Sequence, residues 1–308
     1  MEQHHLSLTE IMPFYIRTKG LIMSDLDNMH YDYIQRVRKV MLYIESHLDE
    51  QLELQKLAKI AAFSPFHFYR IFRSLVGESL SEYLRRLRLD RAALQLRAGQ
   101  KNIITIALEA GYETHSSFSK AFKKHLGKTP SSYRHEGKEQ NLLINLKTLN
   151  QGIKMDAEII ETENINVLFI RRTGNYCASA PDATKTLWSQ LGNQGIDIQA
   201  QQYYGIAHDD PDITKEEQVR YDACVAKAVG MKISGELSEQ NIPGGKHVRF
   251  VHKGTLTKLS ETYDYIYGHW LPNSGKQLAD RPCVLEYIHK PDCLDEDKWV
   301  TNVYLPLA

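Results

Sequence analysis

The spacing of apolar residues between positions 62 and 77 predicts a short helix that is buried along one face. The stretch reads AFSPFHFYRIFRSLVG, and its apolar residues follow the i, i+3, i+4, i+7 rule of an amphipathic helix. These residues are Phe68, Ile71, Phe72 and Leu75. Ser64 is a favourable N-cap and Pro65 a favourable first helical residue, so we expect the helix to begin there. Gly77 is expected to end it.

Nearly the same pattern returns about fifty residues later, in GYETHSSFSKAFKKHLG at 111–127. Phe118, Ala121 and Phe122 hold its apolar face, with His125 or Leu126 as the next position, and Gly127 ends it. A short apolar segment precedes each copy. Small residues at the breaks, Ala61–Ala62 and Ala110–Gly111, let two helices approach closely. We therefore predict two helix-turn-helix motifs.

A single helix over 80–99 is predicted between the two motifs. The segment LSEYLRRLRLDRAALQLRAG ends at a glycine, and its apolar residues include Leu80, Tyr83, Leu84, Leu87 and Leu94. At 1.5 Å per residue the helix is about 25–30 Å long. One turn of DNA is about 34 Å, so one chain could place two helices in successive major grooves.

The second half of the chain contains another repeated series of motifs. Each series has an apolar strand pattern, a tryptophan, a polar turn and a second strand pattern, and the spacings agree within one residue. The fold class that we predict is multi-domain, with an N-terminal all-α double helix-turn-helix joined to a C-terminal α+β domain of two βαββ repeats. The expected boundaries are 1–30 for an N-terminal extension, 31–137 for the helix-turn-helix domain, 138–154 for a linker and 155–308 for the α+β domain.

Charge is distributed unevenly between the halves. The whole chain has 38 Lys and Arg against 38 Asp and Glu. Residues 1–150 carry 22 basic and 16 acidic residues, whereas residues 151–308 carry 16 and 22. Within 51–138 the counts are 16 and 7, a net charge of +9. The positive excess over the two motifs indicates a polyanionic partner.

Composition and cysteine spacing narrow the class of protein. With 42% hydrophobic and 25% charged residues, the chain has the composition of a soluble globular protein. There is no apolar run near 18 residues and no signal-type apolar block at the start, so we expect a cytoplasmic protein without membrane contact. The four cysteines show no metal-type spacing and are expected to be free buried thiols, a reactive sensor being the alternative: Cys177, Cys224, Cys283 and Cys293.

The duplicated motif closely resembles the DNA-binding half of the AraC/XylS family of transcription regulators. The resemblance covers residues 40–134 and rests on QLELQKLAKIAAFSPFHFYRIFRSLVG, SEYLRRLRLDRAALQL and IALEAGYETHSSFSKAFKKHLGKTPSSYR. The second half resembles the GyrI-like, multidrug-binding effector domains through GIAHDDP (205–211), RYDACV (220–225), PCVLEY (282–287) and VTNVYLPL (300–307). These resemblances imply a regulator of transcription, expected to be an activator, whose partners are double-stranded DNA, RNA polymerase and a small effector.

The AraC-like resemblance implies that the outer face of each second helix reads DNA bases. The matching positions in the first helix are Phe66, His67, Tyr69, Arg70 and Arg73. Those in the second are His115, Ser116, Ser117, Ser119 and Lys120. Arg70 is the strongest candidate because a guanidinium can pair with both guanine acceptors. Phosphate contacts are expected from Lys123, Lys124, Lys128 and the cluster Arg85, Arg86 and Arg88.

In the GyrI-like half, Glu286 is the main candidate for ligand binding. Alternation places it on the same strand face as Val284 and Ile288, where an unpaired carboxylate is costly to bury. The resemblance carries this position over as the acid at a pocket floor, so we predict a cationic or amphipathic ligand; a salt-bridged or rim glutamate is the alternative. Candidate aromatic walls, each of which plain core packing would also explain, are Trp188, Tyr221, Tyr267, Trp270 and Tyr287.

Other chemistry receives weaker support from the residues. The HDDPD segment at 208–212 has the residue types of a metal site, but its aspartates and proline are also typical of a turn at the end of a strand. We favour the turn and therefore expect no metal, and we expect no cofactor. No common enzyme motif is present, so we expect a non-enzyme. Two alternatives remain open: a hydrolase with Glu286 as general base assisted by Tyr221 or Tyr267, and a protein-binding module whose acidic segments (216–218 and 295–298) contact a topoisomerase or polymerase.

Overall fold

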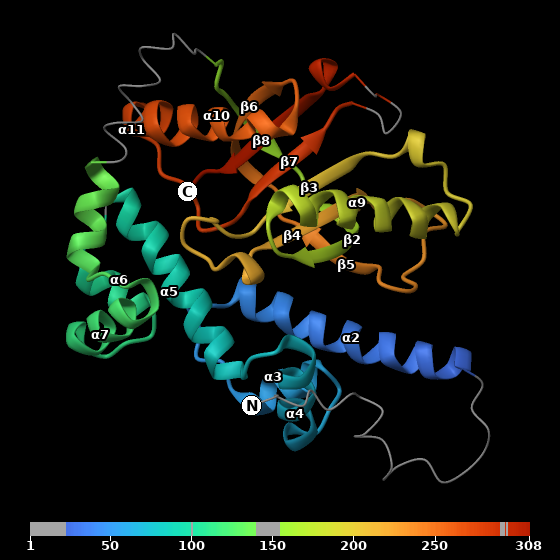
Figure 1. Ribbon diagram of the computed structural model, residues 1–308, viewed down its shortest axis with the longest axis horizontal. Helices are drawn as coiled ribbons and strands as arrows, with labels where there is room; N and C mark the ends of the chain where they lie inside the picture. The colour runs from blue at the N-terminus through green and yellow to red at the C-terminus, as the bar shows by residue number, and fades with distance from the viewer. Residues whose placement is uncertain (1–22, 100, 140–154, 290–292, 294) are drawn as a thin grey trace, which may run out of the picture.

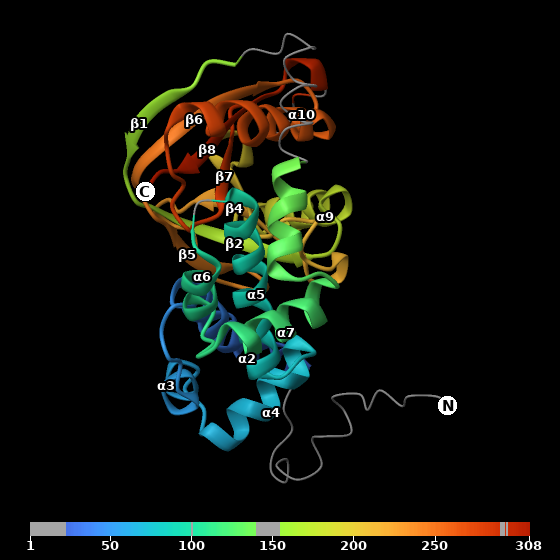
Figure 2. The same ribbon diagram turned by 90° about the vertical axis from the view of Figure 1, so that its left-hand side faces the viewer.

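The computed structural model describes residues 23–99, 101–139, 155–289, 293 and 295–308, except for the side chains of residues 23–30 and Phe66. The chain is helical up to residue 139 and is built on one sheet from residue 155 (Figure 1). The view turned by 90° shows that the helical half lies against the sheet half (Figure 2). The helices of the first half are α2 (Met23–Ser46), α3 (Leu54–Ile60), α4 (Pro65–Val76), α5 (Leu80–Ala98), α6 (Ile103–Glu109) and α7 (His115–Leu126), and residues 130–139 are also helical.

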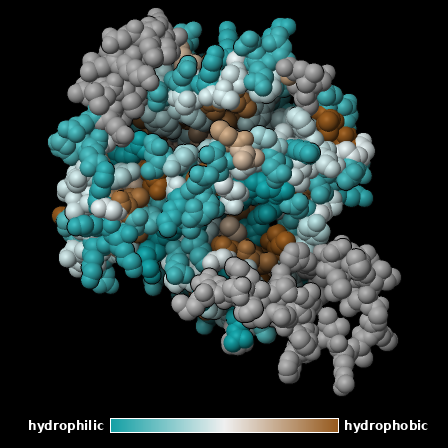
Figure 3. All heavy atoms as spheres, viewed as in Figure 1, coloured by the Kyte–Doolittle hydropathy of each residue, from teal (hydrophilic) through white to brown (hydrophobic). Residues whose placement is uncertain are grey.

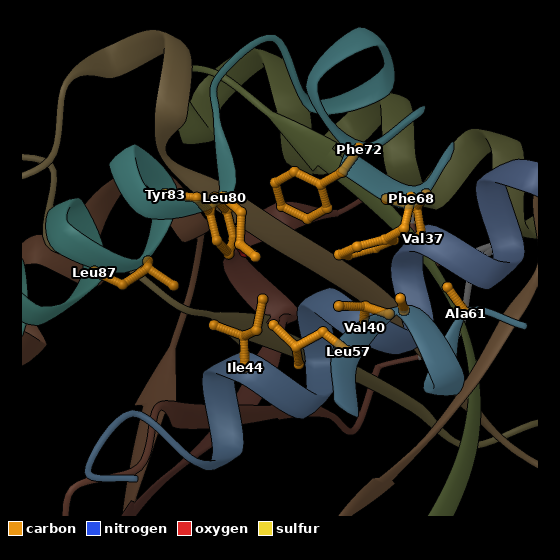
Figure 4. Packing of buried hydrophobic residues seen from close by; sticks show 11 residues of the cluster. Val37, Val40, Ile44, Leu57, Ala61, Phe68, Phe72, Leu80, Tyr83 and Leu87 are labelled. Atoms are coloured by element: carbon orange, nitrogen blue, oxygen red, sulfur yellow. The ribbon is translucent and has the colours of Figure 1, made fainter. Parts of the chain in front are cut away.

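The first helix-turn-helix consists of α3 and α4, which pack against α2 and the start of α5. Phe68, Phe72 and Tyr83 are at most 1% exposed, and the ring of Phe72 lies 5.6 Å from Phe68 and 5.7 Å from Tyr83. Figure 4 shows these side chains pointing into one core together with residues of α2 and α3. The Ser64 side chain caps α4, and Gly77 closes it at a φ of 83°, which confirms both predicted ends.

The second helix-turn-helix, α6 and α7, repeats this construction. Thr114 caps α7 through its side chain, and Gly127 ends the helix at a φ of 76°. Phe118 and Phe122 are fully buried with ring centroids 5.5 Å apart, as the sequence pattern predicts. Ile213, from the other half of the chain, belongs to the same buried cluster. The core of the second motif is therefore completed by the sheet half.

Helix α5 joins the two motifs and has the predicted length. A reciprocal capping box between Ser79 and Glu82 begins it, and Gly99 ends it at a φ of 73°. Leu94, one of the apolar residues of this helix, is 43% exposed. The first half of α5 packs on one motif and the second half on the other. The apolar stripe therefore shifts along the helix, to Leu89, Ala93 and Leu96.

The second half is an eight-stranded sheet in which all paired strands are antiparallel. Its order is β1-β6-β8-β7-β3-β4-β2-β5. The strands are β1 (Glu158–Thr162), β2 (Ile165–Thr173), β3 (Tyr203–Ala207), β4 (Arg220–Ala226), β5 (Ser238–Ile242), β6 (Gly245–Lys253), β7 (Cys283–Tyr287) and β8 (Val300–Pro306). Strands β7 and β3 lie at the centre of the sheet. From β3 toward one edge the order is β4 and then β2, and from β7 toward the other edge it is β8 and then β6. The division into two βαββ repeats agrees with this order and stays an interpretation.

The two faces of the sheet are covered differently. One face packs against α9 (Tyr176–Gly192) and, over β6, β7 and β8, against a segment of α10 (Leu259–Tyr263), the π-helix η4 (Asp264–Trp270) and α11 (Leu271–Ser274). We call this the helix-bearing face. Toward β5, the opposite face meets α2, where Leu42 packs against Phe169 and its buried neighbours. We call it the docking face.

Two further expectations can be compared with the structure. All four cysteines are free. The expectation that they are buried is confirmed for Cys224, holds in part for the half-buried Cys283 and Cys293, and is wrong for Cys177, which is exposed. Cys177 lies near the start of α9, where a small residue can occupy the solvent side of the helix. Among the described residues, no helix is long and apolar enough to cross a membrane.

Gly205 lies in β3, between strands β4 and β7, and one tyrosine from each of these two strands extends over it. The hydroxyl groups of Tyr221 in β4 and Tyr287 in β7 are 2.6 Å apart. A Cβ atom at position 205 would lie 2.4 Å from the first hydroxyl and 2.6 Å from the second. The tyrosine pair therefore requires glycine at this position.

We expect the substitution Gly205→Ala to destabilise the sheet half by about 1–3 kcal/mol, because the methyl group must separate the two hydroxyls. The matched control is Gly192→Ala at the end of α9, where nothing lies within 4 Å of the added methyl group. It is expected to be neutral or to stabilise by up to about 1 kcal/mol. Thermal denaturation of both variants checks this, and equal melting temperatures would contradict it.

Candidate functional site

The outer face of α4 presents the side chains that the sequence analysis selected. His67, Tyr69, Arg70 and Arg73 are exposed, and Tyr69 is 41% accessible although it is aromatic. The buried face of the same helix is held by Phe68 and Phe72, so these four side chains must point away from the core. Phe66 has no described side chain, and its predicted role lies outside the described residues.

The outer face of α7 is more polar and partly engaged in its own structure. His115, Ser116, Ser117 and Lys120 are exposed, and Ser119 is half-buried. The hydroxyl of Ser117 donates to the Thr114 carbonyl at 2.9 Å, while its backbone N–H donates to the Thr114 hydroxyl at 3.1 Å. Ser117 thus helps to begin the helix. Lys120 and, one turn later, Lys123 provide the exposed positive charge.

The predicted phosphate-binding cluster on α5 is wrong in two of its three residues. Arg86 is 8% exposed and forms an ion pair with Glu78 at 2.6 Å. Arg88 donates from Nε to the carbonyl of Leu48 at 2.9 Å and from Nη2 to that of Glu50 at 2.7 Å. Both arginines therefore hold the fold together. Arg85, like Lys123 and Lys124, is exposed, while Lys128 pairs with Glu136 at 2.5 Å.

On the helix-bearing face, the structure brings several of the predicted aromatic residues together. Tyr221 and Tyr287 share a hydrogen bond above Gly205, and burial raises the pKa of Tyr287 to about 12. Trp188 of α9 packs edge-on against Tyr203, with ring centroids 6.0 Å apart. The indole N–H of Trp188 is buried and has no hydrogen-bond partner in the part of the chain that the structure describes. Such a donor is suited to a polar group of a bound molecule.

The other two aromatic candidates lie near the second group of helices. Tyr267 of η4 is 41% exposed and lies beside Tyr263, whose hydroxyl is 3.6 Å from the sulfur of Cys283. Trp270 packs edge-on against Phe250 at 5.2 Å and contributes to the core there. In Figure 3, apolar residues reach the surface between the α10 and α9 regions. The aromatic set is thus distributed over the two groups of helices on the helix-bearing face.

Glu286 does not join these aromatic residues, because it lies on the docking face. Successive residues of a strand point to opposite faces, so Glu286 and Tyr287 diverge. The Glu286 Oε2 atom accepts hydrogen bonds from the Tyr304 hydroxyl at 2.6 Å and from the Asn302 amide at 2.8 Å. Burial and this bond to Glu286 raise the pKa of Tyr304 to about 12. One pocket holding both Glu286 and the aromatic walls is therefore not formed.

The HDDPD segment forms the predicted turn and then supplies contacts between the halves. Asp210 Oδ1 accepts from the backbone of Asp212 at 2.9 Å, as in an Asx-turn. His208 lies 2.7 Å from Asp222, and Asp209 lies 2.6 Å from Arg220. These residues belong to a larger buried group that joins α2 to β2 and β4. We call it the interdomain ion network, and its members are Glu45, Arg171, His208, Asp209, Arg220 and Asp222.

Glu45 of α2 is the member of the network that comes from the helical half. Its Oε1 atom lies 2.8 Å from Nη1 of Arg171 and 2.6 Å from Nη1 of Arg220, and it accepts from the Tyr83 hydroxyl at 2.7 Å. Arg171 also makes two bonds to Asp222, at 2.6 and 2.9 Å. The Asp222 side chain is fully buried. Sequence reasoning missed this network; its only signal was the alternation Arg220, Tyr221, Asp222 in one strand.

The network keeps its carboxylates ionised despite their burial. Burial opposes the charge on Glu45, but Arg171 and Arg220 outweigh it and lower the pKa of this carboxyl to about 2. Burial likewise opposes the charge on Asp222, yet Arg171 and His208 hold its pKa well below the ordinary value. Arg220 overcomes the effect of burial at Asp209 and lowers its pKa too. All three acids are thus stabilised as anions by basic neighbours, and for Glu45 these neighbours lie in the other half of the chain.

Comparison with known families assigns both halves. Residues 155–308 match the family described as "GyrI-like small molecule binding domain", and residues 57–136 match the family described as "Helix-turn-helix domain". The chain is 26% identical over 249 residues to the right origin-binding protein of Escherichia coli K12, covering 77% of this chain and 84% of that protein.

Two more matches cover different parts of the chain. The regulatory protein SoxS of Salmonella typhimurium is 35% identical over 101 residues, which is 33% of this chain and 94% of that protein. The solved structure "Cryo-EM structure of EcmrR-DNA complex in EcmrR-RPo" matches 83% of this chain and 99% of that chain at 16% identity, with a TM-score of 0.43. That score is too low to support an argument about this chain.

We expect stability to fall as the pH drops below about 5, because unfolded Asp and Glu titrate near 3.9 and 4.3. The pKa values of the network carboxyls are lowered in the folded protein, so their contribution is present above the unfolded pKa and is lost as the pH falls through the folded one. Urea denaturation at several pH values between 7 and 3 measures this decrease in the free energy of unfolding.

The variant Glu45→Gln tests the same network at constant pH. It leaves two buried guanidiniums short of one carboxylate, so we expect a loss of about 3–5 kcal/mol at pH 7 and a weaker dependence on acid. Glu163→Gln, an exposed acid in the turn after β1, is the control and is expected to change neither. A Glu45→Gln protein as stable as the wild type would contradict the assignment.

Proposed function

The chain belongs to the family of GyrI-like small molecule binding domains, joined here to a helix-turn-helix domain of the AraC type, and we propose that one chain reads two successive major grooves of DNA. It is a DNA-binding transcription regulator with an effector-binding C-terminal domain. The proposal adds the way in which the two motifs share one DNA site. We propose that the protein is cytoplasmic and acts on chromosomal DNA.

The observation that carries this proposal is the placement of α4 and α7 around α5. Each helix has a fully buried phenylalanine pair on one side and exposed polar side chains on the other. The connecting helix has 19 residues, which at 1.5 Å each is about 28 Å, close to the ~34 Å repeat of the major groove. In this arrangement Arg70 reads bases, and Lys120 and Lys123 support docking to the backbone.

The sign of regulation and the protein partner are proposed from the AraC-type resemblance. We expect activation through contact with RNA polymerase, as is common among such regulators. The acidic residues of the segments at 216–218 and 295–298 are exposed, as solvated charges usually are. No contact of the described residues favours a topoisomerase as the partner of these segments, so we propose RNA polymerase as the protein partner.

We place the effector on the helix-bearing face, beside Trp188, Tyr221, Tyr267 and Tyr287. Three observations support this choice: the unpaired indole N–H, the tyrosine pair above Gly205 and the neighbouring π-helix, a rare element that often marks functional sites. Aromatic rings favour a flat, cationic or amphipathic molecule. The alternative hydrolase gains no support, because Glu286 and Tyr221 lie on opposite faces of the sheet.

Selection of bound sequences from a random duplex library tests DNA reading. We expect a bipartite site with half-sites about ten base pairs apart. Arg70→Ala should lose about 1–3 kcal/mol of discrimination at one base, whereas Lys123→Ala should weaken all sequences alike and reduce the salt dependence by about one ion. Lys185→Ala, an exposed lysine on α9, is the control and should behave as wild type. No enriched sequence at low salt would overturn the proposal.

A binding assay with a panel of cationic amphiphiles tests the effector face. Trp188→Phe removes the unpaired N–H and should weaken binding by about 1 kcal/mol, roughly fivefold. Glu286→Gln keeps its shape on the docking face and should leave the affinity unchanged. The reverse pattern, with only Glu286→Gln weakening the affinity, would move the site to the docking face.

A further inference from the structure

The loop that joins β3 to β4 contacts the core of the second helix-turn-helix motif directly and is linked to the core of the first through the interdomain ion network. Its residues 208–214 read HDDPDIT, and we call it the 208–214 loop. Its first residues enter the interdomain ion network, and its last residues enter the second motif.

The beginning of the loop is tied to the first motif through Glu45. Asp209 holds Arg220 with two bonds, at 2.8 Å to Nε and 2.6 Å to Nη2, and Arg220 lies 2.6 Å from Glu45. Glu45 in turn accepts from Tyr83 of α5, whose ring packs against Phe72 of α4. A continuous set of contacts therefore leads from the loop to the core beneath α4.

The end of the loop is tied to the second motif. Ile213 is 7% exposed and belongs to the cluster of Phe118 and Phe122 beneath α7. The hydroxyl of Thr214 donates to Asp90 of α5 at 3.1 Å, and the other oxygen of Asp90 lies 2.7 Å from His125 of α7. The Thr214 and Asp90 side chains are buried, so water does not compete for these bonds.

A third contact fixes the loop to the far end of α5. Asp210 lies 2.8 Å from Nη1 of Arg97, and both side chains are about three-quarters buried. Asp212 is 3.8 Å from the same arginine, but its side chain is 77% exposed. Asp210 and Asp212 thus carry equal charge in one loop, while only the former makes a close, sheltered contact.

These contacts bear on the distance between the two recognition helices. Both motifs share α5, so a small rotation of either motif about this helix would change the separation of α4 and α7. DNA presents successive major grooves at a fixed repeat of about 34 Å, so the separation decides which spacing of half-sites can be bound. A brace between the motifs reduces the conformational freedom that binding would otherwise have to remove.

We infer that the 208–214 loop positions the two recognition helices relative to each other, and so determines the half-site spacing that the regulator accepts. This inference rests on the proposed two-groove reading of DNA. Among the residues whose side chains the structure describes, the loop's contacts are with the ion network, with α5 and with the core of the second motif, not with the recognition side chains. Its loss is therefore expected to relax spacing while leaving the sequence of each half-site unchanged.

The test uses the full-length triple variant Asp210→Asn, Ile213→Ala and Thr214→Val, which removes the loop's contacts to α5 and to the core of the second motif. Its matched control is Asp212→Asn, with the same charge change at the exposed acid of the same loop. Both are measured against the selected DNA site and against copies with one base pair inserted or deleted between the half-sites. One inserted base pair should cost the wild type and the control about tenfold in affinity or more.

The triple variant is expected to lose less than about threefold on the same insertion, with unchanged bases selected in each half-site. An insertion penalty equal to that of the wild type would overturn the inference. If the wild type selects no bipartite site, the two-groove proposal fails instead, so the two failures are distinguishable.

A second measurement does not depend on DNA. Spin labels at Ser74 of α4 and Ser116 of α7, both exposed, report the distance between the helices in a background where the exposed Cys177 is serine. The wild type and Asp212→Asn should give one narrow distance distribution, and the triple variant a broad one. A narrow distribution in the folded triple variant, verified by circular dichroism, would overturn the inference.

Discussion

The docking of the two halves depends on buried ion pairs between a carboxylate of α2 and two arginines of the sheet. Burying an isolated carboxylate or guanidinium is costly, and that cost is offset only when partners with good geometry meet it. Glu45 comes from α2, while Arg171 and Arg220 come from two strands of the sheet. The Glu45 carboxylate meets these two arginines only when the halves are docked in this arrangement. The apolar contact of Leu42 with the sheet adds affinity but little directional preference.

Strand β4 links this network to the opposite side of the sheet. Along it, Arg220 and Asp222 point to the docking face, and Tyr221 between them points to the helix-bearing face. A displacement of Tyr221 by a ligand would have to move the backbone that carries both charged neighbours. Gly205 in the adjacent strand leaves no spare volume beneath the tyrosine pair. The sheet is thus a rigid layer through which the two faces are mechanically connected.

The helix-turn-helix motifs were predictable because their information is local. Caps at Ser64 and Thr114, stops at Gly77 and Gly127 and phenylalanines one turn apart all act within a few residues of one another. The charged residues were less predictable. Arg86 and Arg88 resemble solvated positive charges in the sequence, yet their partners, Glu78 and two backbone carbonyls before α3, are brought near only by folding. Glu286 was placed on the correct strand face, but the aromatic residues expected around it occupy the other face.

The sequence by itself determined the two duplicated motifs, their boundaries, the length of the helix between them and the charge contrast of the halves. Each of these follows from periodicity, capping and composition, which operate over short stretches of chain. Only the tertiary structure decided that the 208–214 loop completes the core of the second motif and that Glu45 pairs with two arginines more than a hundred residues away. Such contacts depend on how the halves dock, and no short-range pattern encodes that geometry.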